Sequence, residues 1–173
     1  MNNTKVILIT ATSGLGKSTL SAKIKNQLRG RRVDIIPTDT VRQVMRIENP
    51  KDFLLNKQVR HLSHEEHVLQ AQQVSQTVAE LCRYFAKGDR DYIIVEGFSL
   101  DLKTIKEALY DFNVTSVFLE PKNQTYKDRL VENRLEWWPE WDLVHEVLKD
   151  QNYHFRLDPK EVDEYILEQI IKH

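Results

Sequence analysis

The sequence predicts an α/β fold in which helices cover both faces of a parallel sheet. Apolar segments of strand length alternate with amphipathic segments of helix length, and this alternation is typical of parallel sheets. A glycine-rich loop joins the first apolar segment to the first amphipathic one. Neither an internal repeat nor a low-complexity linker divides the 173 residues. The whole chain, 1–173, is therefore expected to form a single domain around one hydrophobic core.

Five apolar segments are expected to form the strands. The clearest is Lys5–Thr10, in which β-branched and other apolar residues follow one another without interruption. The remaining four segments are 33–36, 92–96, 114–119 and 153–157. Pro121 is expected to end the fourth strand, because proline has no amide hydrogen to donate within a sheet.

Helices are expected where apolar residues recur every three or four positions. The first follows the glycine-rich loop, carries Leu20, Ile24 and Leu28 on one face and stops near Gly30. The longest covers 63–87 and is followed by a glycine. The other helices are expected at 40–48, from 101, at 126–134, from 139, and near the C-terminus with Val162, Ile166 and Ile170 facing inward.

Composition and charge exclude several classes of protein. The 25 Lys and Arg residues are balanced by 26 Asp and Glu, so the chain lacks the basic excess of a general nucleic-acid-binding protein. Cys82 is the single cysteine, which precludes an internal disulfide and indicates a small buried residue. No apolar run approaches the roughly 20 residues that span a bilayer. A cytoplasmic monomer or homodimer without nucleic-acid or membrane partners is expected.

The loop after the first strand carries the strongest functional signal. Residues 11–18 read Ala-Thr-Ser-Gly-Leu-Gly-Lys-Ser. They match the phosphate-binding P-loop pattern of glycine, four residues and Gly-Lys-Ser, except that Ala11 stands at the first position. Alanine can close this turn if its φ is negative. The strand before the motif and the helix after it are the context that the motif requires, so the sequence predicts nucleotide binding.

The role that each residue type in this loop would have in binding phosphate has a chemical basis. Gly14 and Gly16 let backbone amides turn inward around a polyphosphate, and the following helix adds a favourable dipole. Lys17 would reach the β- and γ-phosphates of ATP and stabilise the transferred phosphoryl group, while Ser18 would ligate the Mg²⁺ that bridges these phosphates. The loop residues expected to contact the nucleotide are Thr12, Ser13, Gly14, Leu15, Gly16, Lys17, Ser18 and Thr19.

Two carboxylates follow neighbouring segments of the expected sheet. Glu96 ends the third strand and Asp39 follows the second, so both should lie at the edge where the P-loop lies. Glu96 can hold Mg²⁺ through water or orient a nucleophile; alternatively it caps a helix or pairs with a surface lysine. Asp39 can accept the proton of an attacking hydroxyl; alternatively it is only the N-cap of a helix that starts at Thr40.

Two arginines follow Asp39 on the same predicted helix. Arg42 and Arg46 are four residues apart and therefore share one helical face. Together they could hold an anionic acceptor in line with the γ-phosphate while Asp39 accepts its proton. The acceptor-binding set that these residues predict is therefore Asp39, Arg42 and Arg46.

Three segments together resemble small P-loop kinases of the nucleoside-monophosphate-kinase type. They are the P-loop, Ile-Ile-Val-Glu96-Gly-Phe, and Pro-Thr-Asp39-Thr-Val-Arg-Gln-Val-Met-Arg46. The last segment is especially similar to 2-phosphoglycerate kinases. The general resemblance to small P-loop kinases spans nearly the whole chain, whereas the resemblance to 2-phosphoglycerate kinases rests on about nine residues plus the P-loop. The general resemblance implies the P-loop NTPase three-layer fold, with five parallel strands in the order 2-3-1-4-5. It also implies ATP as phosphate donor and a mobile lid.

The lid that this resemblance implies falls around 122–150. Arg129 and Arg134 lie in it, Arg129 as a candidate for nucleotide binding and Arg134 for acceptor binding. They are five residues apart and cannot both point the same way on an ideal helix. We expect at least one to contact phosphate, with plain surface charge as the alternative.

Two clusters near the expected site have alternative interpretations. The tryptophans could stack on a base or simply pack locally; they are Trp137, Trp138 and Trp141. The histidines could hold a metal or belong to an acceptor-binding region; they are His61, His64 and His67.

The leading hypothesis from the sequence is an ATP- and Mg²⁺-dependent kinase acting on a small anionic metabolite such as 2-phosphoglycerate. The Asp-x-x-Gly and Asn-Lys-x-Asp signals of a GTPase are missing from the chain. Two alternatives stay open. One is a nucleoside, nucleotide or polynucleotide 5′-hydroxyl kinase, in which the tryptophans would stack on bases. The other is a regulatory ATP-binding protein that transfers nothing.

Overall fold

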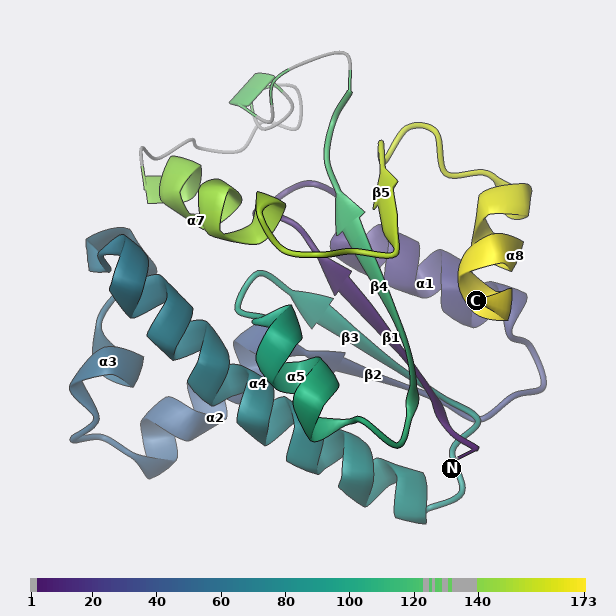
Figure 1. Ribbon diagram of the computed structural model, residues 1–173, viewed down its shortest axis with the longest axis horizontal. Coiled ribbons are helices and arrows are strands. Elements are labelled where there is room, and N and C mark those ends of the chain that lie inside the picture. Colours follow the sequence, from purple (N-terminus) through teal and green to yellow (C-terminus); the bar gives the residue numbers. More distant parts are fainter. Residues whose placement is uncertain (1–2, 123–124, 126, 129–130, 132–139) are drawn as a thin grey trace.

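The structure is a computed structural model that describes residues 3–122, 125, 127–128, 131 and 140–173, with the backbone alone at 60 and 140 (Figure 1). Five parallel strands form one sheet in the order β2-β3-β1-β4-β5. The strands are β1 (Lys5–Thr10), β2 (Val33–Pro37), β3 (Tyr92–Gly97), β4 (Asn113–Leu119) and β5 (Phe155–Leu157). The predicted fold class and strand order are confirmed.

Helices cover both faces of this sheet. One face carries α1 (Lys17–Gln27) and α8 (Glu164–Lys172), and the other carries α4 (His64–Lys87) and α5 (Leu102–Ala108) (Figure 1). The remaining described helices are α2 (Thr38–Glu48), α3 (Phe53–Asn56), the 3₁₀ turn η1 (Val59–His61) and α7 (Glu140–Lys149). None of these helices has the length and apolarity that crossing a membrane requires.

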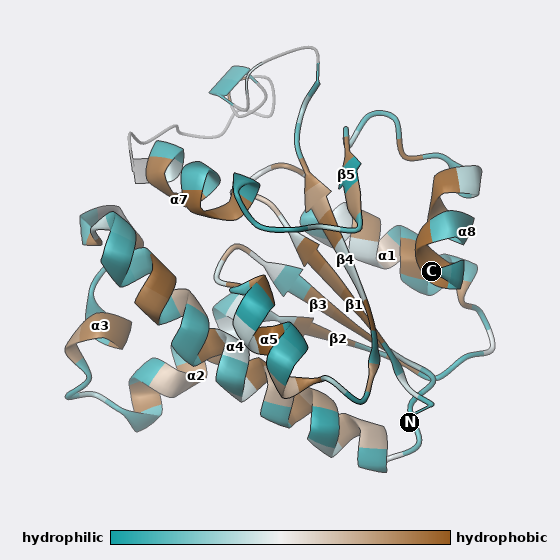
Figure 2. Ribbon diagram, in the orientation of Figure 1, coloured by the Kyte–Doolittle hydropathy of each residue, from teal (hydrophilic) through white to brown (hydrophobic). Residues whose placement is uncertain are grey.

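The central strand β1 explains why the sheet is covered on both sides. Val6 and Leu8 point into the cluster under α4 and α5, whereas Ile7 and Ile9 point into the cluster under α1 and α8. All four side chains are fully buried, and Figure 2 shows β1 as apolar along most of its length. Burial of each such side chain stabilises the fold by about 1.5–3 kcal/mol. The uninterrupted apolar run in the sequence therefore reflects burial on both faces of the sheet.

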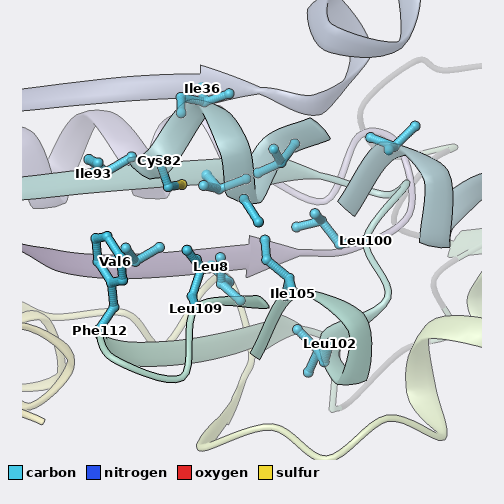
Figure 3. Packing of buried hydrophobic residues seen from close by; sticks show 14 of the residues in the cluster. Val6, Leu8, Ile36, Cys82, Ile93, Leu100, Leu102, Ile105, Leu109 and Phe112 are labelled. Carbon is cyan, nitrogen blue, oxygen red and sulfur yellow. The ribbon is translucent and has the colours of Figure 1, made fainter. Parts of the chain in front are cut away.

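Cys82 lies inside the α4 side of the core, as the sequence predicts. Figure 3 shows its sulfur among apolar side chains that include Val6, Leu8 and Ile93. Burial raises the pKa of the Cys82 thiol to about 12. The residue is thus a small apolar packing element with no thiolate at neutral pH.

Some boundaries differ from those predicted. The helix α2 begins at Thr38 rather than at Thr40, and α3 and η1 occupy a stretch for which no element was predicted. The strand β5 begins at Phe155 rather than at Tyr153, and the ring of Tyr153 stacks on Phe118 at 5.0 Å before the strand starts. The predicted helix at 126–134 lies almost wholly outside the described residues.

At Gly97 the backbone of β3 lies close to Thr38 in the first turn of α2. A Cβ atom built on Gly97 would lie 1.6 Å from Oγ1 of Thr38, which is itself fully buried. Nothing larger than a hydrogen fits there unless the first turn of α2 moves. The contact also fixes α2 relative to the sheet edge, and α2 carries several of the predicted site residues.

We expect Gly97→Ala to lower the free energy of unfolding by about 1–3 kcal/mol, because overpacking forces the backbone to shift. Urea denaturation of the purified variant measures this change. Gly88→Ala is the matched control, since the Cβ at Gly88 would come no closer than 3.3 Å to the carbonyl oxygen of Phe85. Equal losses in the two variants would contradict the close approach.

Candidate active site

The carboxyl ends of β1, β2 and β3 meet at one edge of the sheet. Thr10 pairs with Gly97, and Pro37 pairs with Glu96, so the three strands end side by side. The P-loop leaves from β1, Asp39 follows β2 and Glu96 ends β3. The topology therefore brings together three segments that are far apart in the sequence, as the fold class requires.

The P-loop has the backbone that anion binding requires. Gly14 and Gly16 have φ values of 75° and 90°, in the left-handed region that favours glycine. Gly16 is the N-cap of α1 and offers no side chain to the first amides of the helix, which leaves them free to face a ligand. Ala11 is fully buried and is not among the residues with positive φ. Alanine thus fits the first position of the motif.

Lys17 is held in place by the loop that precedes it. Its Nζ donates hydrogen bonds to the carbonyl oxygens of Ala11 at 3.1 Å and Thr12 at 2.9 Å. Burial lowers the pKa of Lys17 to about 8, while the carboxylates of Asp39 and Glu96 oppose that shift. The ammonium group is therefore held against the P-loop, and the charges of both carboxylates act on it.

Glu96 lies against the first turn of α1. Its Oε1 accepts a hydrogen bond from Oγ of Ser18 at 2.9 Å, and its Oε2 accepts one from Oγ of Ser21 at 2.7 Å. The sequence analysis did not identify Ser21. Its spacing of three residues from Ser18 places both hydroxyls on one helical face, and this was the signal available. Neither alternative for Glu96, a helix cap or a pair with a surface lysine, is what the structure shows.

The oxygen atoms around Glu96 suit Mg²⁺. This ion prefers a few protein oxygens completed by phosphate oxygens and water. The hydroxyl of Ser18 and the carboxylate of Glu96 supply such oxygens beside the P-loop. No cluster of three or more His, Cys, Asp or Glu residues that could ligate a metal occurs among the described residues. Within these residues, the protein alone therefore does not supply a complete set of metal ligands.

Asp39 lies within the first turn of α2. The N-cap of this helix is Pro37, and no side chain makes a capping hydrogen bond there. The interpretation of Asp39 as the N-cap is therefore wrong, because the helix already begins at Thr38. Desolvation raises the pKa of the Asp39 carboxyl, and the charges of Lys17 and Arg42 oppose the rise. The Asp39 carboxyl thus interacts electrostatically with Lys17 of the P-loop and with Arg42 of α2.

Arg42 and Arg46 are half-buried on the same helix. Nη2 of Arg42 donates to the carbonyl oxygen of Lys57 at 3.3 Å, and Nη1 of Arg46 donates to Oε1 of Gln43 at 3.4 Å. The Nε atom of each arginine is buried and has no hydrogen-bond partner within the described structure. Burial lowers the pKa of Arg42, and the like charge of Arg46 lowers it further. The two guanidinium groups are thus close and incompletely paired.

A cleft opens on the other side of the P-loop. It has a volume of about 100 Å³ and lies between α1 and the segment that follows β5. Gly16, Thr19, Lys23, Leu119 and Pro159 are among its lining residues. Both apolar and polar atoms line this cleft, and Gly16 of the P-loop is at its border.

The structure leaves several predicted residues out of view. Arg129, Arg134, Trp137 and Trp138 lie outside the described residues. Trp141 is described, and its ring meets that of Phe98 edge-on at 5.5 Å, as local packing predicts. The three histidines of η1 and α4 form no metal cluster within the described chain. His61 and His64 are exposed, whereas His67 is buried.

Solved structures that are similar to this chain support the fold, whereas the comparisons of its sequence found no match. Neither a protein-family model nor a curated protein matches the sequence. Among solved structures, the APS kinase CysC of Mycobacterium tuberculosis in complex with AMPPNP and APS is 13% identical, with 97% of this chain and 95% of that chain covered and a TM-score of 0.61. A sugar kinase from Janibacter sp. is 14% identical, with 98% and 92% covered and a TM-score of 0.60.

A gluconokinase from Sinorhizobium meliloti is also similar. It is 14% identical, with 97% of this chain and 87% of that chain covered and a TM-score of 0.54. The sequence identities are too low to carry a function from these proteins to this one. The chain therefore shares the three-layer fold of small P-loop kinases, with the strand order that this fold has.

Proposed function

We propose that the protein is an ATP- and Mg²⁺-dependent phosphotransferase that acts on a hydroxyl group of a small anionic metabolite. One observation carries the proposal. At the sheet edge, the negative charges of Asp39 and Glu96 both act on the P-loop lysine, and Glu96 accepts a hydrogen bond from the P-loop serine. A phosphate cradle, a metal-binding pair and a candidate base are thus next to one another.

The donor nucleotide would lie along the P-loop. Backbone amides of residues 13–19 and the ammonium of Lys17 would bind its phosphates. The cleft lined by Thr19, Lys23 and Pro159 would receive the base. The APS kinase neighbour was solved with AMPPNP, an ATP analogue, and this supports the choice of an adenine nucleotide for a shared fold.

Ser18 and Glu96 would hold Mg²⁺ beside the β- and γ-phosphates. The bound ion neutralises charge on these phosphates when it is present. Ser21 keeps one carboxylate oxygen of Glu96 in place through its hydroxyl, so Glu96 is oriented before any ligand arrives. Such pre-positioning lowers the reorganisation that the reaction needs.

Asp39 would act as the base of the transfer step. The acceptor hydroxyl oxygen forms a bond to the γ-phosphorus while the bond to the β–γ bridging oxygen breaks. ADP leaves with that electron pair, and the hydroxyl proton passes to the carboxylate of Asp39. Lys17 stabilises the negative charge that the phosphoryl oxygens carry during this exchange.

Arg42 and Arg46 would hold the acceptor. Both lie on α2 beyond Asp39, and both have buried Nε atoms that no described residue satisfies. An anionic acceptor such as 2-phosphoglycerate would supply the missing oxygens. In such kinases the helix after the fourth strand supplies lid arginines, and we propose this role for Arg129 and Arg134 in the segment around 122–150 here.

Acceptor-stimulated ADP release from Mg-ATP tests the proposed function. The purified protein is assayed with separate pools of phosphorylated C3 to C6 acids, sugars, nucleosides and a 5′-hydroxyl oligonucleotide. We expect one pool of small anionic acceptors to raise the rate, and chelation of Mg²⁺ to abolish it. If ATP binds but no pool accelerates its turnover, the kinase proposal fails and a regulatory ATP-binding role takes its place.

A further inference from the structure

We propose that the protein forms a homodimer in which the edge strand β2 of one copy pairs antiparallel with β2 of a second copy. The two strands meet at Ile35 around a two-fold axis, and the apolar groove beside each strand is buried in the same interface. The sequence left a monomer and a homodimer equally open. The proposal holds whether or not the protein is a kinase, because this surface is not part of the candidate active site.

The strand β2 has a free side. It lies at one end of the strand order, and its neighbour within the described chain is β3 alone (Figure 1). The carbonyl oxygen of Arg32, just before β2, accepts a hydrogen bond from the amide of Tyr92 at 3.2 Å and so points toward β3. Main-chain groups of successive strand residues point alternately to the two sides. The main-chain groups of Val33, Ile35 and Pro37 therefore point away from the sheet.

Antiparallel pairing centred on Ile35 satisfies every outward amide of β2. The two Ile35 residues face each other and exchange both of their main-chain hydrogen bonds. Val33 faces Pro37 of the partner subunit, and the Val33 amide donates to that carbonyl oxygen. Proline has no amide hydrogen and leaves no outward donor without an acceptor. This match of the strand with itself favours a second copy over an unrelated strand.

An apolar groove opens beside this free side. It has a volume of about 400 Å³, which is within the range of binding pockets, and it runs between α2 and α4. Side chains four residues apart on each helix line it: Thr40, Val44 and Glu48 on α2, and Thr77, Leu81 and Phe85 on α4. It also touches residues 35–37 of β2. Because successive strand residues point to opposite faces, a groove that touches all three reaches the free edge of the strand.

Large apolar side chains beside the groove are exposed. Val44 lines the groove and is 47% exposed, and Ile47 on the same helix is 69% exposed. Tyr84 is 71% exposed, and its ring lies 5.8 Å from that of Phe85, which lines the groove. Contiguous exposed apolar patches mark interaction sites in soluble proteins. This patch is thus a second indication of a protein partner.

The two-fold axis brings the patches of both copies together. An axis that relates two antiparallel strands of one sheet is perpendicular to that sheet. The helices α2 and α4 of both copies then lie on the same side of the joined sheet, next to the axis. Each patch is therefore covered by the same patch of the other copy, as in the isologous interfaces of most dimers.

The charge on β2 does not oppose this pairing. Asp34 is the single charged residue of the strand, and its Oδ2 lies 2.5 Å from Nε of Arg90. Many edge strands avoid self-association through charged side chains that repel a second strand. Here the carboxylate is neutralised within its own subunit, so two copies of the strand do not repel each other.

The interface leaves the candidate active site open. Val44 and Glu48, which line the groove, lie on one face of α2. Asp39, Arg42 and Arg46 lie on the opposite face, as the helical spacing requires. A partner seated on the groove therefore contacts α2 from the side away from the proposed base and arginines.

Sedimentation equilibrium of the full chain without ligand tests the dimer. We expect the apparent mass to rise reversibly from that of a monomer to that of a dimer with protein concentration. Amide hydrogen exchange followed by NMR then locates the contact. The amides of Val33 and Ile35 should exchange more slowly as the dimer fraction rises, whereas the amides of β5, at the opposite edge, should keep their rates.

Two pairs of variants separate strand pairing from other contacts. Val33→Pro removes an outward amide and leaves the bonds between β2 and β3 in place, so we expect the dimer Kd to rise about 10-fold or more. Val33→Ala keeps this amide and is the matched control. Val44→Asp should weaken the dimer similarly, because it buries a charge in the interface. Its control is Leu69→Asp, since Leu69 is also exposed but does not line the groove.

The proposal has clear points of failure. A chain that stays monomeric at the highest attainable concentration overturns it. A dimer whose Val33 and Ile35 amides stay unprotected, or one as tight in Val33→Pro and Val44→Asp as in the wild type, uses another surface and also overturns it. Equal weakening by Val33→Ala and Val33→Pro would overturn the strand contact. Thermal unfolding verifies that each variant is folded. None of these measurements involves ATP turnover, so failure of the proposed function would leave them unaffected.

Discussion

Lys17→Ala is expected to lower the kcat of acceptor-stimulated ADP release on the order of 10²–10³-fold or more. The ammonium of Lys17 is held by two carbonyl oxygens of its own loop, at 3.1 Å and 2.9 Å, before any nucleotide binds. It is therefore positioned where the negative charge of the transferred phosphoryl group develops. Steady-state ADP release with saturating ATP and acceptor measures the loss.

Lys25→Ala is the matched control for this substitution. Lys25 lies on the same helix and is exposed, so its removal should leave kcat unchanged. Loss of the fold is not the expected cause for Lys17→Ala, because burial already disfavours its ammonium. A Lys17→Ala enzyme that keeps its kcat within a few-fold of the wild type would contradict the role of Lys17 in transfer.

The pH dependence of the reaction should reflect the same lysine. With a pKa of about 8 in the free enzyme, Lys17 loses its proton, and with it its positive charge, as the pH rises through 8. We expect kcat/KM for ATP to fall above this pH, since this quantity reports ionisations of the free enzyme. An activity that stays level up to pH 10 would show that Lys17 keeps its charge and would contradict the low pKa.

The sequence was sufficient to predict the features that follow from local patterns. The P-loop, the alternation of strands and helices, and the positions of Asp39 and Glu96 after their strands are all local. In a parallel sheet the carboxyl ends of neighbouring strands converge, so the grouping of these residues followed from the fold class. The strand order came from the resemblance to small kinases, and the structure confirms it.

Contacts between distant segments could not be predicted in this way. The hydrogen bond from Ser21 to Glu96 joins residues 75 positions apart, and the contact of Thr38 with Gly97 depends on how β3 and α2 pack. The burial of His67 likewise depends on how α4 packs, whereas the sequence suggested for this histidine a metal site or an acceptor-binding region. Each of these features is set by tertiary packing, which residue spacing does not reveal.

The helix α2 shows how a local sequence pattern and tertiary packing together position the site residues. Its sequence pattern places Val41 toward the core, where this side chain is buried, and Asp39, Arg42 and Arg46 toward polar surroundings. The contact between Thr38 and Gly97 then anchors the first turn at the sheet edge. A change in that contact would therefore move the candidate base and both arginines together, and Gly97→Ala should impair turnover as well as stability.

Asp39→Asn is expected to lower kcat on the order of 10²–10⁴-fold, the range that a general base contributes. The amide keeps the size of the side chain but cannot accept the hydroxyl proton. ATP affinity should stay nearly intact, because Asp39 follows β2 and is not part of the P-loop. Equilibrium binding of a fluorescent ATP analogue and steady-state turnover separate these two effects. Unchanged turnover would remove Asp39 from the role of base.

The pH profile of the Asp39→Asn enzyme distinguishes a base from a merely structural residue. Desolvation raises the pKa of Asp39, so the wild-type enzyme should gain activity as the pH rises through that value, and the variant should lack this acidic limb. The carboxylate of Asp39 also raises the pKa of Lys17. Its removal should therefore move the alkaline limb of kcat/KM to lower pH. A structural role alone would lower the rate at every pH and leave the acidic limb in place.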